Sequence, residues 1–475
     1  MTVVAPAPEG PRAHRVRASW WSVVVLVLAA IPRSWAALWD GGVFLPDETF
    51  QTLEPAHHLA FGWGMMPHEF REGARSWLFP GVLGVVWKIA ARVGVQEPAS
   101  FVGIARVGMA TFSLVAVWFA MALARRLAGE RAAIVAGLLV GACPPLIALG
   151  TRTFTEVAAA PLIALAALLV VRGRRRDAAL AGVAAGVTIF LGYPNALLVV
   201  GFLGLLFAQG RTREASAYAT SASATAVFGG LLDWPTWGWP FHALWGYLGS
   251  TPATTGAFPY YEQHLSSSIG LTYALLLVGL VLVWRRARGL VLIVVGFVVA
   301  LSFPNGKELR LLLPVLPLAV ALAAVGLTRL MDGVGRRPVA TYLFALGCAA
   351  QMTWVTHDMT RGELGFGGGD WVIWHSGADY LRVTEEAGAA TDLCGIIYVG
   401  NEPSWTGGYS YLHRPVPIFF DMQGPHLAAA NYIVGAKTDR PPTGWRSVHT
   451  DGGYALFRRD GTCTTPPRDW SMSLP

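Results

Sequence analysis

The stretch GIARVGMATFSLVAVWFAMALARR, residues 103–126, decides the fold class, because a long apolar run ends directly on an arginine pair. A helix that crosses a bilayer needs about 20 mainly apolar residues. The same pattern recurs along a chain of 475 residues that is 54% hydrophobic and 14% charged. Soluble domains carry about 25% charged residues, so the sequence predicts an all-α polytopic membrane protein.

The arginine clusters predict how the chain crosses the membrane. All six clusters can be cytoplasmic only if one of the twelve apolar runs does not cross. The clusters lie within 12–17, 125–131, 172–176, 211–213, 285–288 and 329–337. Residues 76–93 contain Pro80, Lys88 and Arg92, so we predict a helix along the outer interface there. About eleven spans remain, with the N-terminus cytoplasmic and the C-terminus extracytoplasmic. They are 18–39, 103–124, 132–149, 157–171, 178–193, 195–209, 215–232, 268–284, 289–304, 309–328 and 339–356. The bias to arginine over lysine indicates a GC-rich source, and we place the chain in a bacterial plasma membrane.

The composition divides the chain into three predicted regions. We expect a cytoplasmic lead at 1–17, a transmembrane module at 18–357 with outer loops 40–102, 233–267 and 305–308, and a small extracytoplasmic α/β domain at 358–475. Short apolar runs in the last region read as strands: CGIIYVG, VPIFF, NYIVG and YALFRRDG. Cys394 and Cys463 both fall there, and in an oxidising compartment they could pair. Two unrelated buried thiols are the alternative.

The first outer loop carries most of the unusual polar residues. Asp47 and Glu48 follow Pro46, and the spacing puts Asp47, Gln51, Glu54 and His58 on one face of a helix. Helix capping explains acids in a first turn after proline. A carboxylate facing a cavity at the membrane surface is also a candidate general base for a hydroxyl proton.

Histidines and arginines in the same loop suggest further contacts. His57, His58 and His68 suggest a metal site, but they lack the spacing of a helical histidine pair, so we predict no metal. We predict substrate contacts instead for five residues of this loop: Gln51, Glu54, His58, His68 and Glu69. A divalent metal stays an open alternative, and no cofactor is predicted. Arg75 could hold a lipid phosphate or could anchor the loop to headgroups.

The other two outer loops add aromatic and basic groups. The stretch DWPTWGWPFHALWGYLGSTPATTGAFPYYEQHL at 233–265 suits stacking on sugar rings, although an aromatic belt explains part of it. Lys307 and Arg310 stand at the mouth of a span, where they could pair with Glu308 or meet an anionic leaving group. The candidate substrate contacts here are Asp233, Trp237, Trp239, Tyr260, Tyr261 and His264.

Several function classes find no support in the sequence. It has no P-loop and no glycine-rich dinucleotide motif. No basic, aromatic-interleaved tract suits nucleic acid, so no nucleic-acid partner is predicted. An enzyme that uses a nucleotide-sugar at the cytoplasmic face would need a longer cytoplasmic loop. A transporter or lipid flippase remains the rival, but it predicts charges inside spans and internal repeats, whereas the charges here gather in outer loops.

The first outer loop, PDETFQTLEPAHHLAFGWGMMPHEFREGARSWLFP, resembles that of the mannosyltransferases that build the GPI-anchor core and the N-glycan precursor. These Alg9-like and PIG-B-like enzymes have the GT-C fold and use dolichyl-phosphate-mannose. RTFTE at 152–156, DWPTWGWPF with GAFPYYEQH, and GKELRLLLPVLP at 306–317 are similar and come in the same order. Two segments depart from the family pattern: His68-Glu69-Phe70 replaces its acid and tryptophan, and Asn305-Gly306 replaces its histidine.

The resemblance implies an inverting glycosyltransferase that takes a sugar from a polyprenyl-phosphate donor. Mannose is the sugar to which the resemblance points. Arabinose, glucose or an amino sugar would need similar machinery. By match, Asp47 is the expected base with Glu48 beside it, and Arg75, Lys307 and Arg310 contact the donor phosphate. The expected partners are this donor, a hydroxyl of a glycolipid or glycan acceptor, and membrane lipid.

Overall fold

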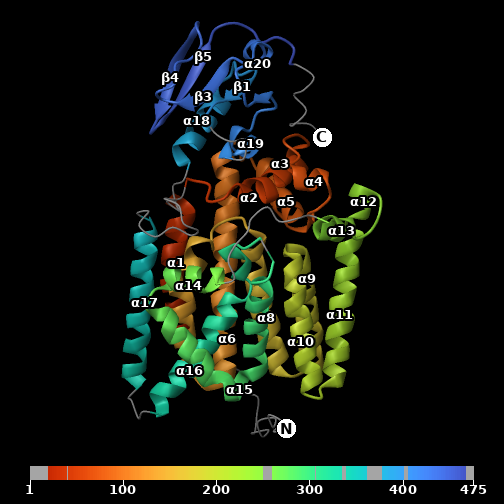
Figure 1. The fold of residues 1–475 in the computed structure, drawn as a ribbon, viewed down its shortest axis with the longest axis vertical. Helices are drawn as coiled ribbons and strands as arrows, with labels where there is room; N and C mark the ends of the chain where they lie inside the picture. Colours follow the sequence, from red (N-terminus) through yellow and green to blue (C-terminus); the bar gives the residue numbers. More distant parts are fainter. Residues whose placement is uncertain are drawn as a thin grey trace. The chain divides into compact units, whose positions relative to one another are not determined.

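The computed structural model describes residues 20–39, 41–249, 259–304, 306–333, 338–360, 377–400 and 405–466. Its helices and strands are drawn in Figure 1. The chain forms two compact units. The helical unit comprises 1–36, 108–241 and 250–370, and the mixed unit comprises 37–107, 242–249 and 371–475. The predicted N-terminal lead and the predicted segment 250–258 of the second outer loop lie outside the described residues.

The helical unit is built from long apolar helices, and α9, α10 and α11 run side by side in Figure 1. The long helices of the described chain are α1 (Trp20–Trp39), α6 (Pro98–Ala142), α8 (Thr155–Arg172), α9 (Arg175–Leu191), α10 (Ala196–Ala208), α11 (Thr212–Leu231), α15 (Thr272–Leu301), α16 (Leu316–Gly333) and α17 (Pro338–Thr360). Shorter elements join them: α7 (Pro144–Ala148), η2 (Tyr193–Asn195), α12 (Trp234–Trp237), α14 (Tyr260–Ile269) and η3 (Leu309–Leu312). This confirms the predicted fold class, an integral, multi-pass and mainly helical membrane protein.

Two of the long helices are broken where arginine clusters interrupt the apolar pattern. Ala128 and Gly129 leave the helical conformation inside α6, and Ala287 does so inside α15. Within the described residues, five helices are long and apolar enough to span a bilayer by themselves, or six if the bent pair α14–α15 counts as one span. When α6 and α15 are each divided at their breaks, the long helices of the described chain correspond one for one to the eleven predicted runs.

Small residues let the helices of this unit approach closely. A Cβ atom added at Gly326 of α16 would collide with the backbone oxygen of Gly279 in α15. Gly182 of α9 meets the backbone of Tyr218 in α11 in the same way. Helices in lipid associate through such close packing because the bilayer supplies no hydrophobic drive between them. These pairs fix the packing of α9 against α11 and of α15 against α16.

The mixed unit combines the first predicted outer loop with the C-terminal residues. Its helices are α2 (Pro46–Glu48), η1 (Thr49–Leu53), α3 (Glu54–Phe61), α4 (His68–Arg71), α5 (Leu78–Arg92), α13 (His242–Gly249), α18 (Ala378–Ala389), α19 (Gly408–Leu412) and α20 (Gly424–Ala429). The domain boundaries predicted above at 17 and 357 stay predictions.

Helix α5 fills most of the predicted non-crossing run 76–93 and is two-faced. Trp87 is fully buried against Phe101 and Tyr411, while Val82, Val85 and Ile89 are 57%, 59% and 56% exposed. An apolar face of this kind is typical of a helix that lies in a membrane interface. Its place at the interface stays a prediction.

A five-stranded sheet forms the C-terminal core, in the order β2-β1-β3-β5-β4. The strands are β1 (Ile396–Tyr398), β2 (Ile418–Phe419), β3 (Tyr432–Ala436), β4 (Trp445–Asp451) and β5 (Tyr454–Arg459). The parallel pairs are β1–β2 and β1–β3, while β3–β5 and β5–β4 are antiparallel. The four apolar runs became strands as expected. Strand β4 was missed because it lies at the edge and most of its side chains are exposed, so it lacks an apolar run.

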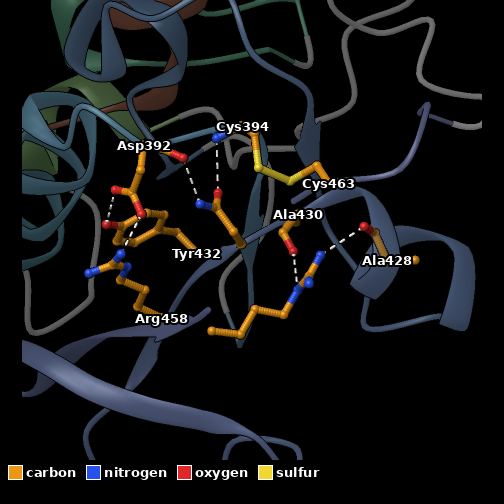
Figure 2. The surroundings of a disulfide bond; sticks show 9 residues. Asp392, Cys394, Ala428, Ala430, Tyr432, Arg458 and Cys463 are labelled. Atoms are coloured by element: carbon orange, nitrogen blue, oxygen red, sulfur yellow. Dashed lines mark hydrogen bonds and ion pairs between the residues drawn. A yellow bond between two sulfur atoms is a disulfide. The ribbon is translucent and has the colours of Figure 1, made fainter. Parts of the chain in front are cut away.

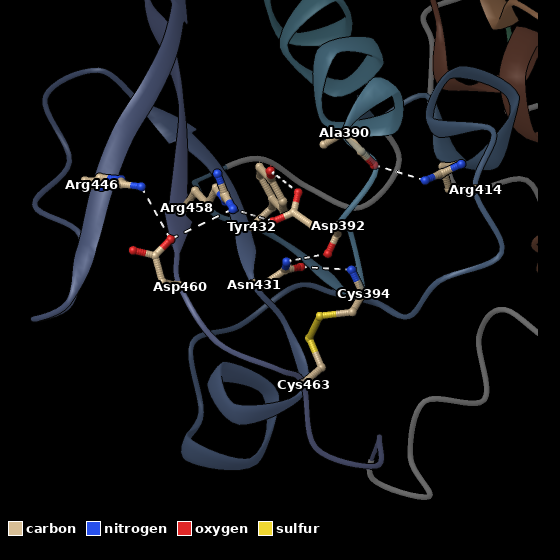
Figure 3. A network of polar contacts seen from close by, with 10 residues as sticks. All are labelled: Ala390, Asp392, Cys394, Arg414, Asn431, Tyr432, Arg446, Arg458, Asp460 and Cys463. Carbon is tan, nitrogen blue, oxygen red and sulfur yellow. Dashed lines mark hydrogen bonds and ion pairs between the residues drawn. A yellow bond between two sulfur atoms is a disulfide. The ribbon is translucent and has the colours of Figure 1, made fainter.

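A disulfide joins Cys394, just before β1, to Cys463, beyond β5, with 6.0 Å between their Cα atoms (Figure 2). The Cys394 backbone N–H donates to Asn431 Oδ1 at 2.9 Å, and Asn431 Nδ2 donates to the Asp392 backbone oxygen at 2.7 Å (Figure 3). Arg458 also pairs with Asp392, at 2.7 Å. The bridge therefore closes a segment whose start is already held to β3 and β5.

Replacing Cys394 and Cys463 together by serine should lower the free energy of unfolding of the C-terminal region by about 4 kcal/mol. The physical reason is that the bridge spans 69 residues, so its loss frees a long loop in the unfolded chain. Thermal unfolding of the full chain with and without reductant measures the effect. The control is Cys143→Ala/Cys348→Ala, which removes two buried free thiols and keeps the bridge. Reductant should destabilise the wild type and this control, but not the serine variant. Equal sensitivity in all three proteins would contradict the prediction.

Candidate active site

The acid pair opens the mixed unit's first helix, and its two members have different surroundings. Leu45 is extended and Pro46 starts α2, which places Asp47 and Glu48 in the first turn. Glu48 is 2% exposed, and its Oε1 lies 4.0 Å from Nη2 of Arg106. Asp47 is partly exposed. Glu48 thus has a fixed cation beside it, whereas Asp47 keeps access to solvent.

Arg106 is a site residue that the sequence reading missed. It lies on α6, is 6% exposed, and donates from Nη2 to the Gly42 backbone oxygen at 2.5 Å and to the Tyr411 hydroxyl at 3.4 Å. These contacts tie the segment before α2 to α19. The available signal was a single arginine inside an apolar run, since such charges are costly unless they are paired or functional.

The helix after the acid pair is not regular, so the predicted shared face does not form. Residues Thr49–Leu53 make a π-helix, η1, between α2 and α3. A π-helical turn is wider than an α-helical turn, and the spacing of 4, 3 and 4 then no longer aligns side chains. Gln51 is partly exposed, whereas Glu54 is fully buried. Single π-turns of this kind frequently occur at functional sites.

Glu54 holds the first loop to the C-terminal residues of the same unit. Its Oε1 accepts hydrogen bonds from the Ser410 backbone N–H at 2.5 Å and from Ser410 Oγ at 2.6 Å, and its Oε2 accepts one from Met65 N–H at 3.3 Å. Gly408, with a φ of 59°, leaves room for this carboxyl group, because a Cβ there would lie 2.7 Å from Glu54 Cδ. Glu54 was predicted to contact substrate, but its oxygens are used within the protein.

Burial raises the pKa of Glu54 to about 7, and the hydrogen bonds from Ser410 oppose that shift. The folded protein therefore keeps a proton on Glu54 between its usual pKa of 4.5 and about 7, where the unfolded chain has lost it. Stability from this group is full below pH 4.5 and falls as pH rises to about 7.

Glu54→Gln should remove that pH dependence. We compare how far the free energy of unfolding falls between pH 4.5 and 7 in this variant and in Glu72→Gln, which keeps Glu54. The fall should be smaller in Glu54→Gln, by an amount on the order of 3 kcal/mol. The side chain of Glu72 is 62% exposed and bonds to His68, so it is a matched surface carboxylate. Thermal unfolding of the full chain at both pH values gives the difference, and parallel curves for the two variants would refute it.

A neutral histidine pair links His57 of α3, the helix that begins at Glu54, to His413. His57 Nδ1 faces the Trp63 backbone oxygen at 3.1 Å, so this nitrogen donates, and Nε2 accepts from His413 Nδ1 at 2.9 Å. Burial, followed by the neighbouring His413, lowers the pKa of His57 to about 3. Both rings belong to an aromatic cluster with Phe61, Trp63 and Phe101. His58, the predicted contact next to them, is half-buried, and burial lowers its pKa too.

Glu69 and Arg75 pair with each other. Arg75 Nε donates to Glu69 Oε2 at 2.9 Å and Nη2 donates to Oε1 at 3.2 Å, while Gln51 Nε2 lies 3.4 Å from that same Oε1. The side chain of Arg75 is 30% exposed and that of Glu69 is 40% exposed. Arg75 could still reach a phosphate, but it would have to share its charge with Glu69. His68, also predicted to touch substrate, is exposed and lies 3.1 Å from Glu72.

The helical unit gathers a second group of predicted residues around η3. Lys307 and Arg310 are 6% and 5% exposed, and Arg310 Nε lies 2.5 Å from Glu308 Oε2. The Arg310 guanidinium also lies 4.9 Å above the ring of Phe154, in the segment before α8. Arg152, two residues earlier, is fully buried and was noticed only as part of a motif. Arg310 of η3 therefore contacts the segment that also carries the buried Arg152.

Aromatic groups from α14 pack on the same 3-10 turn. Tyr261 is 1% exposed, and both Tyr260 and Tyr261 have a raised pKa, caused first by burial and also by the charge of Glu308. Tyr260 stacks on His264 with ring centres 3.9 Å apart. Asp233 is buried and lies at the N-cap position of α12, whereas Trp237 is partly exposed and Trp239 is 43% exposed.

The predicted site residues therefore fall into two sets, one in each unit. The mixed unit holds Asp47, Glu48, Gln51, Glu54, His58, His68, Glu69 and Arg75, and the helical unit holds Asp233, Trp237, Trp239, Tyr260, Tyr261, His264, Lys307 and Arg310. Among the described residues, no group of three or more histidine, cysteine or acidic side chains is placed to hold a metal ion.

Comparisons with known proteins show which proteins this chain is similar to. Residues 23–245 match the model of the Alg9-like mannosyltransferase family. GPI alpha-1,2-mannosyltransferase 3 of Homo sapiens is 23% identical over 424 residues, which cover 82% of this chain and 70% of that protein. GPI mannosyltransferase 3 of Yarrowia lipolytica is 37% identical over 105 residues, 22% of this chain and 21% of that protein. The match thus spans about a fifth of the Yarrowia protein. Both relatives are eukaryotic, and the bacterial membrane stays a prediction.

The fold itself is found in a solved bacterial protein. ArnT from Cupriavidus metallidurans, crystallised with undecaprenyl phosphate, superposes with a TM-score of 0.64 at 14% identity and covers 95% of this chain and all of that one. At this identity the likeness concerns the fold, which is that of the GT-C membrane enzymes.

Proposed function

We propose that this chain, a membrane glycosyltransferase of the GT-C fold related to the Alg9-like mannosyltransferases, moves a sugar from a polyprenyl-phosphate donor to a hydroxyl of a glycolipid or glycan. Mannose is the sugar that the family relation favours. The reaction takes place on the outer face of the membrane, where the predicted topology puts the loops that carry Asp47, Lys307 and Arg310.

The cluster of buried cations around η3 is the observation that carries the proposal. Lys307, Arg310 and Arg152 are each at most 6% exposed, and Arg310 bridges to Phe154 of the neighbouring segment. Cations held in fixed positions favour a phosphate group, because its charge is opposite to theirs. The Cupriavidus protein of the same fold was solved with undecaprenyl phosphate bound, which supports a donor of this class.

The chemistry follows from the two kinds of group. The Asp47 carboxylate takes the proton of the acceptor hydroxyl as its oxygen attacks the anomeric carbon from the side opposite the phosphate. The bond between that carbon and the phosphate oxygen breaks, the configuration inverts, and polyprenyl phosphate leaves. Negative charge grows on the leaving phosphate, so fixed cations stabilise the transition state more than the ground state.

Transfer by the purified full-length protein in lipid nanodiscs tests the proposal. The donors are radiolabelled polyprenyl-phosphate mannose, arabinose and glucose, with GDP-mannose as the nucleotide-sugar comparison, and the acceptors are glycolipids from cells that lack the protein. We expect transfer from polyprenyl-phosphate mannose with no nucleotide present. Transfer from another polyprenyl-phosphate sugar would correct the sugar alone. Transfer only from GDP-mannose, or from no donor, would overturn the proposal.

A further inference from the structure

An open cavity of about 580 Å³ lies at the arginine-rich end of the helical unit, and its lining includes none of the residues placed in the proposed reaction. It is formed where three helices meet: the break in α6, the break in α15 and the last turn of α16. Its walls are Arg126, Leu127, Ala128, Gly129, Arg286, Arg329 and Asp332. A volume of this size holds a small ligand or a lipid headgroup.

The walls of this cavity carry uncompensated positive charge. Its one acid, Asp332, is paired with Arg131. Among the described residues, Arg126, Arg286 and Arg329 have no acidic partner. The positive charges of Arg286 and Arg329 repel each other. Arg125, the neighbour of Arg126, is by contrast held by Glu130 at 2.5 Å. Three arginines that face one hollow without a counter-charge would gain from an anion.

The backbone of α6 adds to this positive potential. Gly129 has a φ of 83°, a backbone conformation that residues other than glycine rarely adopt. It separates the two halves of the helix. The second half begins here, so its N-terminal end, which carries partial positive charge, lies beside a residue of the cavity wall. Backbone N–H groups at such an end suit a phosphate.

We propose that this cavity binds a phosphate group, supplied by the headgroup of an anionic membrane lipid or by a water-soluble phosphate ester. Arginine is suited to this role because its planar guanidinium makes paired hydrogen bonds to phosphate oxygens. The tendency of basic residues to stay on one side of a membrane explains why arginines are found at this end. It does not explain why three of them, from three separate helices, surround one hollow. This site is independent of the proposed transferase reaction.

Binding to the full-length protein, purified in neutral detergent, tests the site by native mass spectrometry. One arm titrates phosphatidic acid and phosphatidylglycerol, with phosphatidylcholine as the neutral lipid, and the other titrates glycerol 3-phosphate. Arg126→Gln/Arg286→Gln removes two wall arginines and should weaken binding at least about tenfold. Arg285→Gln/Arg288→Gln removes two charges from the same break in α15 but none from the wall, and binding should stay within about twofold.

The two arms separate the sources of the phosphate. Binding of the anionic lipids alone, lost in the wall variant and kept in the control, identifies a lipid headgroup. Binding of glycerol 3-phosphate with the same dependence on the two variants identifies a soluble phosphate ester. The proposal is overturned if the wild-type protein binds neither, or if both variants weaken binding equally, since a diffuse positive surface would then suffice.

Discussion

Asp47→Asn is expected to lower the rate of sugar transfer by about 10²- to 10⁴-fold, the contribution usual for a general base. Asparagine has the same size but cannot accept the proton of the acceptor hydroxyl. The neighbouring carboxylate is a poor substitute, because Glu48 is 2% exposed and faces Arg106. The turnover number should therefore fall while the Michaelis constant of the donor changes little. Initial rates with radiolabelled polyprenyl-phosphate mannose measure both.

Glu72→Gln is the matched control for this change. It removes one negative charge from the same loop, but the side chain is 62% exposed and contacts only His68 among the partners described above. Its rate should stay within about twofold of the wild type. Glu48→Gln should act differently again, since it removes the carboxylate that lies 4.0 Å from the buried Arg106 and so lowers stability as well as rate. Asp47→Asn with near-normal turnover would remove Asp47 from the mechanism.

The membrane helices were predictable because their signal is local. Residues 103–124 are apolar over more than the thickness of a bilayer core, and Arg125 and Arg126 mark where that signal stops. The structure adds that the chain does not leave the helix there: α6 continues through a break at Ala128 and Gly129. Composition can locate such a boundary, but it cannot tell a loop from a kinked helix.

The contacts of the first loop were beyond the reach of spacing. Glu54 is bound by Ser410, 356 residues away, and no local pattern announces such a pair. The π-helix over Thr49–Leu53 also shifts the register that the spacing assumed. Regular periodicity therefore selected Glu54 as a substrate contact, when its buried carboxyl group joins two parts of the mixed unit.

The same limit applies to the basic residues. Lys307 and Arg310 could be identified as candidates because charges at the mouth of a span are rare. Arg106 was not identified as a candidate because it lies inside an apolar run. Arg152 was noted only as part of the segment RTFTE. Their burial, 6% and 0% exposed, is a property of packing between helices that are distant in sequence.

Arg310→Gln is expected to lower the turnover number by about 10²- to 10³-fold, the loss typical when one fixed group that stabilises transition-state charge is removed. Arg310 is 5% exposed and is held by Glu308 and by the ring of Phe154, so its charge is already in position before the bond breaks. Lys307→Met should have a similar effect if both cations face the leaving phosphate. Single-turnover rates and binding of the product, undecaprenyl phosphate, are the measurements.

A buried arginine elsewhere in the helical unit separates catalysis from stability. Arg33 is fully buried and donates to the Ser113 hydroxyl at 3.0 Å and to the Gly141 backbone oxygen at 2.7 Å. Arg33→Gln should destabilise the protein as much as Arg310→Gln does, yet the rate per folded molecule and the affinity for undecaprenyl phosphate should stay close to the wild type. Arg310→Lys keeps a charge but loses the two-pronged geometry, so its rate should fall between those of the wild type and Arg310→Gln. If Arg310→Gln lowers only stability, as Arg33→Gln does, the cations around η3 are structural and the donor phosphate must be held elsewhere.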